Sequence, residues 1–138
     1  MRRRGGALLL SLALAAGCGS SKSDASIKRH LLRGINQIRT TRDRAELHAK
    51  LVRTLASLRR DHSSTPAERR ARGLAIEGFA ATLKGVRSQL DFMENDSGNV
   101  AAATRDARRA DRYLSRGASR LRAAGAALGI RVGKLSGY

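Results

Sequence analysis

A single proline, Pro66, stands in this chain of 138 residues, and its position constrains the fold more than any other feature. Proline breaks the interior of a helix but is favoured in the first helical turn. Pro66 follows Thr65 and precedes Glu68 by two residues, so Thr65 to Glu68 has the pattern of a capping box at a helix start. The proline-free stretches on either side therefore predict long helices.

The segment after Pro66 carries apolar or small side chains at helical spacing. They are Ala71, Ala75, Phe79, Thr82, Leu83, Val86, Leu90 and Met93. This pattern predicts a helix that ends near Asp96, because Ser97, Gly98 and Asn99 are turn-forming residues. Phe79, Phe92 and Met93 are expected to lie in the core rather than to line a ligand pocket.

Asn99 is expected to cap another helix, which Gly129 ends. Its apolar or small residues occupy positions 103, 107, 110, 114, 117, 118, 121, 124, 125 and 128. The small residues among them predict close packing against a neighbouring helix. Residues 129–138 form a short C-terminal tail, which either frays or lies along the bundle.

The region 26–62 carries two apolar stripes that are rotated by roughly half a turn from each other at about 100° per residue. The first holds Ile27, Leu31, Ile35 and Ile38, the second holds Leu47, Leu51, Leu55 and Leu58, and the smaller Ala45, Ala49, Val52 and Ala56 continue the first. One interpretation, which we favour, is a single long bent helix. The other is a break near residues 40–43, because Asp43 to Glu46 could cap a new helix.

The predicted fold is therefore all-α: an antiparallel up-down bundle of three long helices over residues 26–128, or of four if the break near 40–43 is present. Short connections between helices favour antiparallel neighbours. The chain has no Trp, two Phe and two Tyr, so Ala, Leu and Gly must supply most of its core.

The N-terminal segment is typical of an export signal. Arg2, Arg3 and Arg4 precede the apolar run 7–16, which is too short to span a bilayer permanently. Ala15, Ala16 and Gly17 then lead into Cys18, the sole cysteine of the chain. This arrangement resembles the lipobox of bacterial lipoproteins.

The resemblance implies that Cys18 carries a diacylglyceryl group and that cleavage falls between Gly17 and Cys18. Residues 1–17 would be the signal peptide and 18–25 the lipidated cysteine with a flexible tether. The protein would then be exported and anchored by lipid to the extracytoplasmic face of a bacterial membrane. Cleavage after Ala15 by ordinary signal peptidase, and a twin-arginine signal, are the alternatives.

Charge is the second functional signal. The formal net charge is +17, and loss of the three N-terminal arginines would leave +14. Five arginines share one face of the last predicted helix: Arg105, Arg109, Arg112, Arg116 and Arg120. We call them the arginine stripe. The stripe suggests docking on anionic headgroups, an envelope polymer or an acidic partner protein. Two alternatives remain: a codon bias toward Arg would explain the composition, and the stripe would then be a plain solvated face.

Other function classes find little support in the sequence. An export signal argues against nucleic acid as a partner. His30, His48 and His62 are too far apart along a helix to share a metal ion unless the helix folds back, so no metal site and no cofactor is expected. Glu77, Asp91, Glu94 and Asp96 are expected to pair with arginines of neighbouring helices. No nucleophile motif or phosphate-binding loop is present, and we expect no enzymatic activity.

Two functional hypotheses remain. The first is a non-enzymatic envelope lipoprotein that acts as a basic helical scaffold or interaction module close to the membrane. The second is a lipoprotein that binds an anionic small or lipidic ligand within or across the bundle. The second predicts an apolar cavity of several hundred Å³ with an arginine at its mouth.

Overall fold

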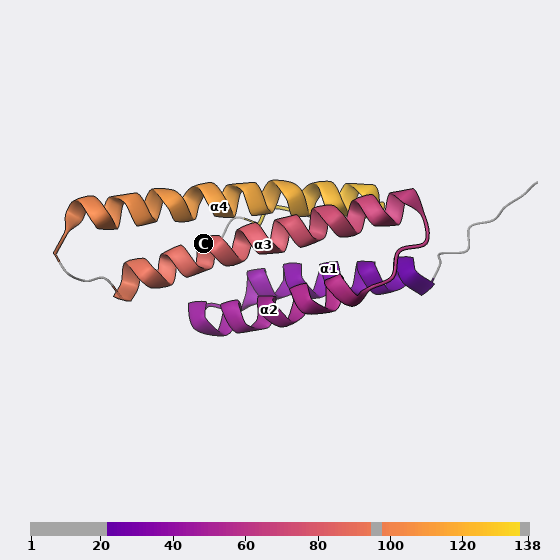
Figure 1. Ribbon diagram of the computed structural model, residues 1–138, viewed down its shortest axis with the longest axis horizontal. Helices are drawn as coiled ribbons and strands as arrows, with labels where there is room; N and C mark the ends of the chain where they lie inside the picture. The colour runs from indigo at the N-terminus through magenta and orange to yellow at the C-terminus, as the bar shows by residue number, and fades with distance from the viewer. Residues whose placement is uncertain (1–21, 95–97, 136–138) are drawn as a thin grey trace, which may run out of the picture.

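The computed structural model describes residues 22–94 and 98–135, which form four helices (Figure 1). These are α1 (Lys22–Thr40), α2 (Arg44–Arg60), α3 (Pro66–Glu94) and α4 (Val100–Ala127). Helices that follow each other in the chain pack antiparallel, and α3 lies between α4 on one side and the α1–α2 pair on the other. The prediction of an all-α antiparallel bundle is confirmed.

The region 26–62 is two helices, so the favoured single bent helix is wrong and the alternative break is correct. Asp43 caps α2, because its side chain accepts a hydrogen bond from the Glu46 amide at 2.6 Å. The chain reverses at this turn, and Thr54 of α2 donates a hydrogen bond to Gln37 of α1 at 2.9 Å. The physical reason is burial: two stripes on different sides of one helix can both reach the core only if the chain folds back.

Both stripes of large side chains are indeed buried, from Ile27 to Ile38 on α1 and from Leu47 to Leu58 on α2. The predicted continuation of the first stripe is not, since Ala45, Ala49 and Val52 are exposed. Large side chains therefore decide which face of α2 turns inward.

The α3–α4 pair is the most closely packed part of the bundle. A Cβ atom added at Gly117 would lie 3.0 Å from the Gly78 carbonyl oxygen and 2.4 Å from the Thr82 hydroxyl oxygen. Glycine is needed there because it leaves room for the two backbones to approach. The prediction that small residues mark close helix packing is confirmed.

The start of the bundle differs from the predicted boundary. Helix α1 begins at Lys22, so residues 22–25, which were expected to belong to the flexible tether, are the first turn of a helix. Asp24 stabilises this turn, since it forms an ion pair with Lys28 at 2.8 Å and carries a negative charge near the helix N-terminus. Residues 18–21 lie outside the described residues.

The described part of the C-terminal tail lies along the bundle. Gly129 has φ +69°, in the left-handed region that ends helices, and the Ile130 amide then donates to the Gly125 carbonyl at 2.8 Å. Val132 packs beside Gly125, and Leu135 is buried in the core. Of the two outcomes expected for the tail, the structure shows docking as far as Leu135.

Candidate functional site

The arginine stripe lies on the outward side of α4. The residues of α4 that pack on α3 are Ala110, Leu114, Gly117 and Leu121, all of them buried. Arg105, Arg109, Arg112 and Arg116 are exposed, whereas Arg120 is partly covered. The helix therefore separates an apolar inner side from a basic outer side, as the sequence predicts.

The five arginines differ in their partners. Arg120 contacts Glu77 of α3, with 3.2 Å between Nε and Oε2, so the prediction that Glu77 pairs across helices is confirmed. Arg109 reaches Asp106 only at 4.0 Å. Within the described residues, Arg105, Arg112 and Arg116 make no ion pair. These three remain available to an outside anion.

The other predicted carboxylates behave differently from Glu77. Asp91 pairs with Arg87 of its own helix at 2.9 Å rather than with a neighbouring helix, which corrects that expectation. Glu94 is exposed, and Asp96 lies outside the described residues. Cys18 and Gly17, the predicted lipidation and cleavage positions, also lie outside them.

A polar network joins α1, α2 and α3 at one end of the bundle, where α1 and α3 begin and α2 ends. We call this the closed end. Glu68 is buried, and its Oε2 accepts from the Ser64 amide at 2.7 Å and from the Ser23 hydroxyl at 2.8 Å. The Thr65 hydroxyl accepts from the Glu68 amide at 3.1 Å, which confirms the predicted capping box. Glu68 also ties α1 to α3, a role that the capping pattern alone does not reveal.

Asp61 is the second acidic residue of the closed end. Its Oδ1 accepts from the Ser26 hydroxyl at 2.7 Å, and its Oδ2 lies 2.6 Å from Nδ1 of His30. A serine nucleophile would need the imidazole beside its hydroxyl, but here the carboxylate lies between them. The arrangement therefore suits a helix-to-helix tie and not nucleophilic catalysis.

The fold-back between α1 and α2 removes the separation that the sequence predicts for His30 and His62, because Asp61, the residue before His62, contacts His30. His30 lies in the closed end, His48 is on α2, and His62 is exposed in the turn before α3. Across residues 22–94 and 98–135, no three His, Cys, Asp or Glu side chains gather where they could hold a metal ion.

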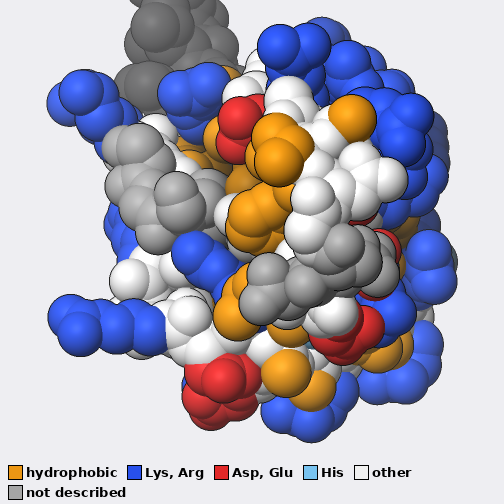
Figure 2. All heavy atoms as spheres, turned by 90° about the vertical axis from the view of Figure 1, so that its left-hand side faces the viewer, with side chains coloured by type: hydrophobic (Ala, Val, Ile, Leu, Met, Phe, Trp, Pro, Cys, Tyr) orange, Lys and Arg blue, Asp and Glu red, His pale blue; other side chains and the backbone are white. Residues whose placement is uncertain are grey.

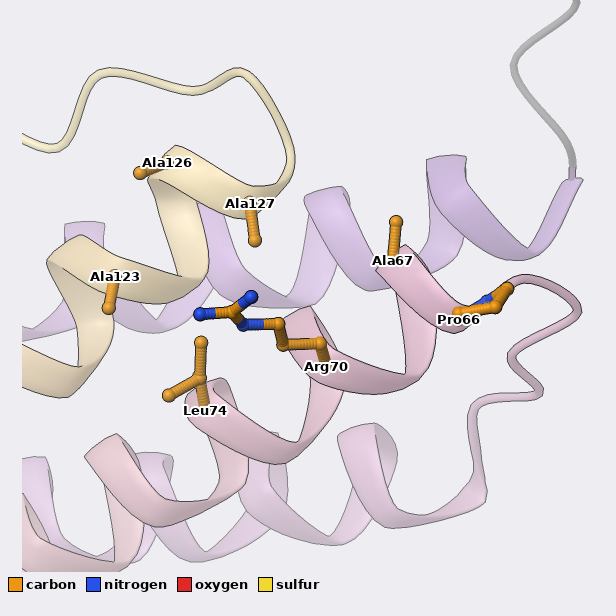
Figure 3. A pocket seen from close by; sticks show the side chains of 7 residues that line it. All are labelled: Pro66, Ala67, Arg70, Leu74, Ala123, Ala126 and Ala127. Atoms are coloured by element: carbon orange, nitrogen blue, oxygen red, sulfur yellow. The ribbon is translucent and has the colours of Figure 1, made fainter.

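A groove between the start of α3 and the end of α4 has a volume of about 530 Å³ (Figure 3). We call it the alanine groove. It is lined by Pro66, Ala67, Arg70, Leu74, Ala123, Ala126 and Ala127. Figure 3 shows the Arg70 guanidinium extending across it toward α4. Its volume is in the range that the second hypothesis predicts, but it is an open surface groove lined mostly by exposed residues and not an enclosed cavity. The sequence did not locate it.

A second groove, of about 400 Å³, lies between α1 and α2. We call it the arginine groove. It is lined by Arg33, Gln37, Arg53, Thr54, Ala56, Ser57 and Arg60. The sequence did not reveal this groove, because its three arginines come from two helices that were expected to be one.

The opposite end of the bundle, where α3 ends and α4 begins, is the open end. Phe92 is 45% exposed, Met93 65% and Val100 77%, so the prediction that Phe92 and Met93 belong to the core is wrong. Figure 2 views this end and shows hydrophobic side chains on its surface, with Lys and Arg around them. Phe79, by contrast, is fully buried as predicted.

None of the described helices is both long and apolar enough to cross a membrane. Comparison with protein-family models, with curated proteins and with solved structures finds no match to this chain.

Proposed function

We propose that this chain is a non-enzymatic, lipid-anchored lipoprotein of the bacterial cell envelope, and that its helical domain is a basic interaction module held close to the membrane. The arginine stripe is its docking surface for an anionic partner. The observation that carries this proposal is the set of three exposed arginines, Arg105, Arg112 and Arg116, which make no ion pair within the described residues.

The start of α1 supports a short attachment. Lys22 is only four residues from Cys18, and four extended residues reach about 14 Å at most. A lipid on Cys18 would therefore keep the closed end near the membrane surface. Arg105 and Arg116 stand 22 and 11 residues before the end of α4, about 33 and 17 Å from the closed end along the helix. The stripe therefore reaches anionic headgroups when the bundle lies along the membrane surface, where exposed basic residues contribute about 1 kcal/mol each.

Lipidation is tested with Cys18→Ser. We expect the variant to stay at precursor size and to carry no acyl group, because the thiol that receives the lipid is missing. Mass spectrometry of the wild-type N-terminus separates an acylated Cys18 from cleavage after Ala15. A Cys18→Ser protein that is processed and fractionates like wild type contradicts the anchor.

The docking surface is tested in the Cys18→Ser chain with Arg105, Arg112 and Arg116 changed to Gln. Binding to vesicles of phosphatidylglycerol and phosphatidylcholine at low salt should fall about tenfold or more, since charge interactions are least screened there. The matched control changes three other exposed arginines, Arg29, Arg42 and Arg69, to Gln. Equal losses in both variants would assign binding to net charge and reject the stripe.

The alanine groove favours a second candidate function, the binding of an anionic amphiphile across α3 and α4. Its volume of about 530 Å³ falls in the range of ligand pockets, and Arg70 makes no ion pair within the described residues. Ala123→Phe would fill the groove from an exposed position. If a fluorescent fatty acid binds wild type and Ala123→Phe equally well, this candidate fails.

A further inference from the structure

The arginine groove has a composition that its place in the bundle does not explain. Arg33 of α1 and Arg53 and Arg60 of α2 line the same hollow of about 400 Å³, and all three are exposed. Like charges on neighbouring helices repel one another, so their convergence costs stability unless an anion offsets it. None of the residues that line the groove is acidic.

The pairing of α1 with α2 sets the arrangement of these arginines. The hydrogen bond between Gln37 and Thr54 and the tie between His30 and Asp61 fix the register of the two helices. By this register Arg33 lies across from the step between Ser57 and Leu58, while Arg53 precedes Ser57 by about one turn and Arg60 follows it by about one turn. On α2, Ser57 therefore lines the groove between the positions of Arg53 and Arg60.

The remaining polar groups of the groove are uncharged and can supply further hydrogen-bond donors. Gln37 uses its Oε1 to accept from the Thr54 hydroxyl at 2.9 Å, which leaves its amide NH₂ to donate. Ser57 contributes a hydroxyl, and each guanidinium has five N–H donors in a planar fork. Asp61, which follows Arg60 in the chain, accepts from Ser26 and contacts His30.

We propose that the arginine groove is a binding site for a phosphate group that carries two or more negative charges, as in a phosphate monoester or a diphosphate. Planar guanidinium groups match the oxygens of phosphate and form short, charge-assisted hydrogen bonds with them. Three arginines call for more than one negative charge, whereas a singly charged phosphodiester leaves an excess of positive charge. The site is separate from the arginine stripe, since it lies on α1 and α2 and the stripe lies on α4.

The direct test is titration of the full chain, purified in a mild nonionic detergent, with inorganic pyrophosphate followed by calorimetry. Changing Arg33, Arg53 and Arg60 together to Gln should weaken binding about tenfold or more. The matched control again changes Arg29, Arg42 and Arg69 to Gln, which removes the same charge and should change the Kd less than about twofold. Equal weakening in both would show a diffuse charge effect and overturn the proposal.

A charge-neutral variant tests the shape of the site. Ser57→Leu places a larger apolar side chain on the lining of the groove and should weaken pyrophosphate binding about fivefold, with helicity unchanged by circular dichroism. Unchanged binding in Ser57→Leu would show that the anion does not enter the groove. Because neither variant touches Cys18 or α4, a negative result here leaves the proposed function standing, and the reverse also holds.

Two further titrations distinguish the sources of the phosphate group. Vesicles of phosphatidylcholine with phosphatidic acid present a monoester on a lipid, whereas vesicles with phosphatidylglycerol present a singly charged diester. A preference for phosphatidic acid that disappears in the triple Gln variant would identify a lipid source, and binding of pyrophosphate alone would identify a soluble one. Equal binding of both vesicles by wild type, with no binding of pyrophosphate, would contradict a site for multiply charged phosphate.

Discussion

Side chains of the same type differ in burial along the bundle, from the closed end to the open end. At the closed end Glu68 is 5% exposed and holds α1 against α3, whereas at the open end Glu94 of the same helix is exposed. Phe79 is fully buried in the middle of α3, and Phe92 near its end is 45% exposed. The two pairs differ in how many helices surround them, and not in residue type.

Helix length explains the difference. Helices α3 and α4 have 29 and 28 residues, but α1 and α2 have only 19 and 17, because the chain turns at residues 41–43. At about 1.5 Å per residue, α2 is shorter than α3 by about 18 Å. Figure 1 shows the α3–α4 pair extending beyond the turn between α1 and α2. The apolar stripe of α3 is therefore core for most of its length and surface at its end.

The largest effect on stability is expected when the two phenylalanines of α3 are each changed to Ala. Phe79→Ala should lower the free energy of unfolding by about 3–5 kcal/mol, since it leaves a cavity where a fully buried ring packed. Phe92→Ala should change it by less than about 1 kcal/mol. Urea denaturation of the Cys18→Ser chain, followed by circular dichroism, measures both. Similar losses would mean that the open end is covered in solution, for example by a second molecule.

A smaller effect is expected from the two glutamates. Glu68→Ala removes the acceptor of the Ser64 amide and of two serine hydroxyls, so stability should fall by about 2–3 kcal/mol. Glu94→Ala should change it by no more than about 0.5 kcal/mol, because this exposed carboxylate lies at the unfavourable C-terminal end of a helix. Hydrogen exchange at the start of α1 would show whether Glu68→Ala frees that helix, and unchanged protection there would contradict the tie.

Two glycines of the α3–α4 pair test whether these helices pack closely enough at Gly117 to exclude a side chain. Gly117→Ala should cost about 1–2 kcal/mol, since a Cβ would press on the backbone of α3 and the gain in helix propensity offsets only part of this. Gly73→Ala has open space around the new methyl group and should stabilise the protein by about 0.5–1 kcal/mol. The melting temperatures should move in opposite directions, and a shift of the same sign in both would reject the close approach at Gly117.

Local signals in the sequence predicted most of the helical architecture. The sequence predicted the capping residues Thr65 and Asn99, the end of the last helix at Gly129 and the buried stripes. Each of these features depends on residue types and spacing within one helix. The outward position of the arginine stripe followed from the same spacing. The close approach at Gly117 also left a compositional trace, the run of small residues.

The features that the sequence did not predict depend on which helices lie side by side. Exposure of Phe92 follows from the length of α2, and the arginine groove requires Arg33 of α1 to lie beside α2. Both depend on the turn before Arg44, for which the sequence offered two interpretations of nearly equal weight. The alanine groove likewise joins residues of α3 and α4 that are far apart in the chain.

The smallest predicted effect addresses this turn by comparing the caps of α2 and α4. Asp43 accepts from the Glu46 amide at 2.6 Å and Asn99 from the Ala102 amide at 3.1 Å, and both caps are exposed. Each change to Ala should cost about 1 kcal/mol in urea denaturation, the usual contribution of an N-cap. Near-equal losses would assign the reversal of the chain to burial of the two apolar stripes, since the cap at Asp43 would then contribute no more than an ordinary cap. A loss at Asp43 of about 3 kcal/mol or more would instead show that the cap itself breaks residues 22–60 into two helices. The short length of α2, and with it the exposure of the open end, would then depend on the Asp43 carboxylate.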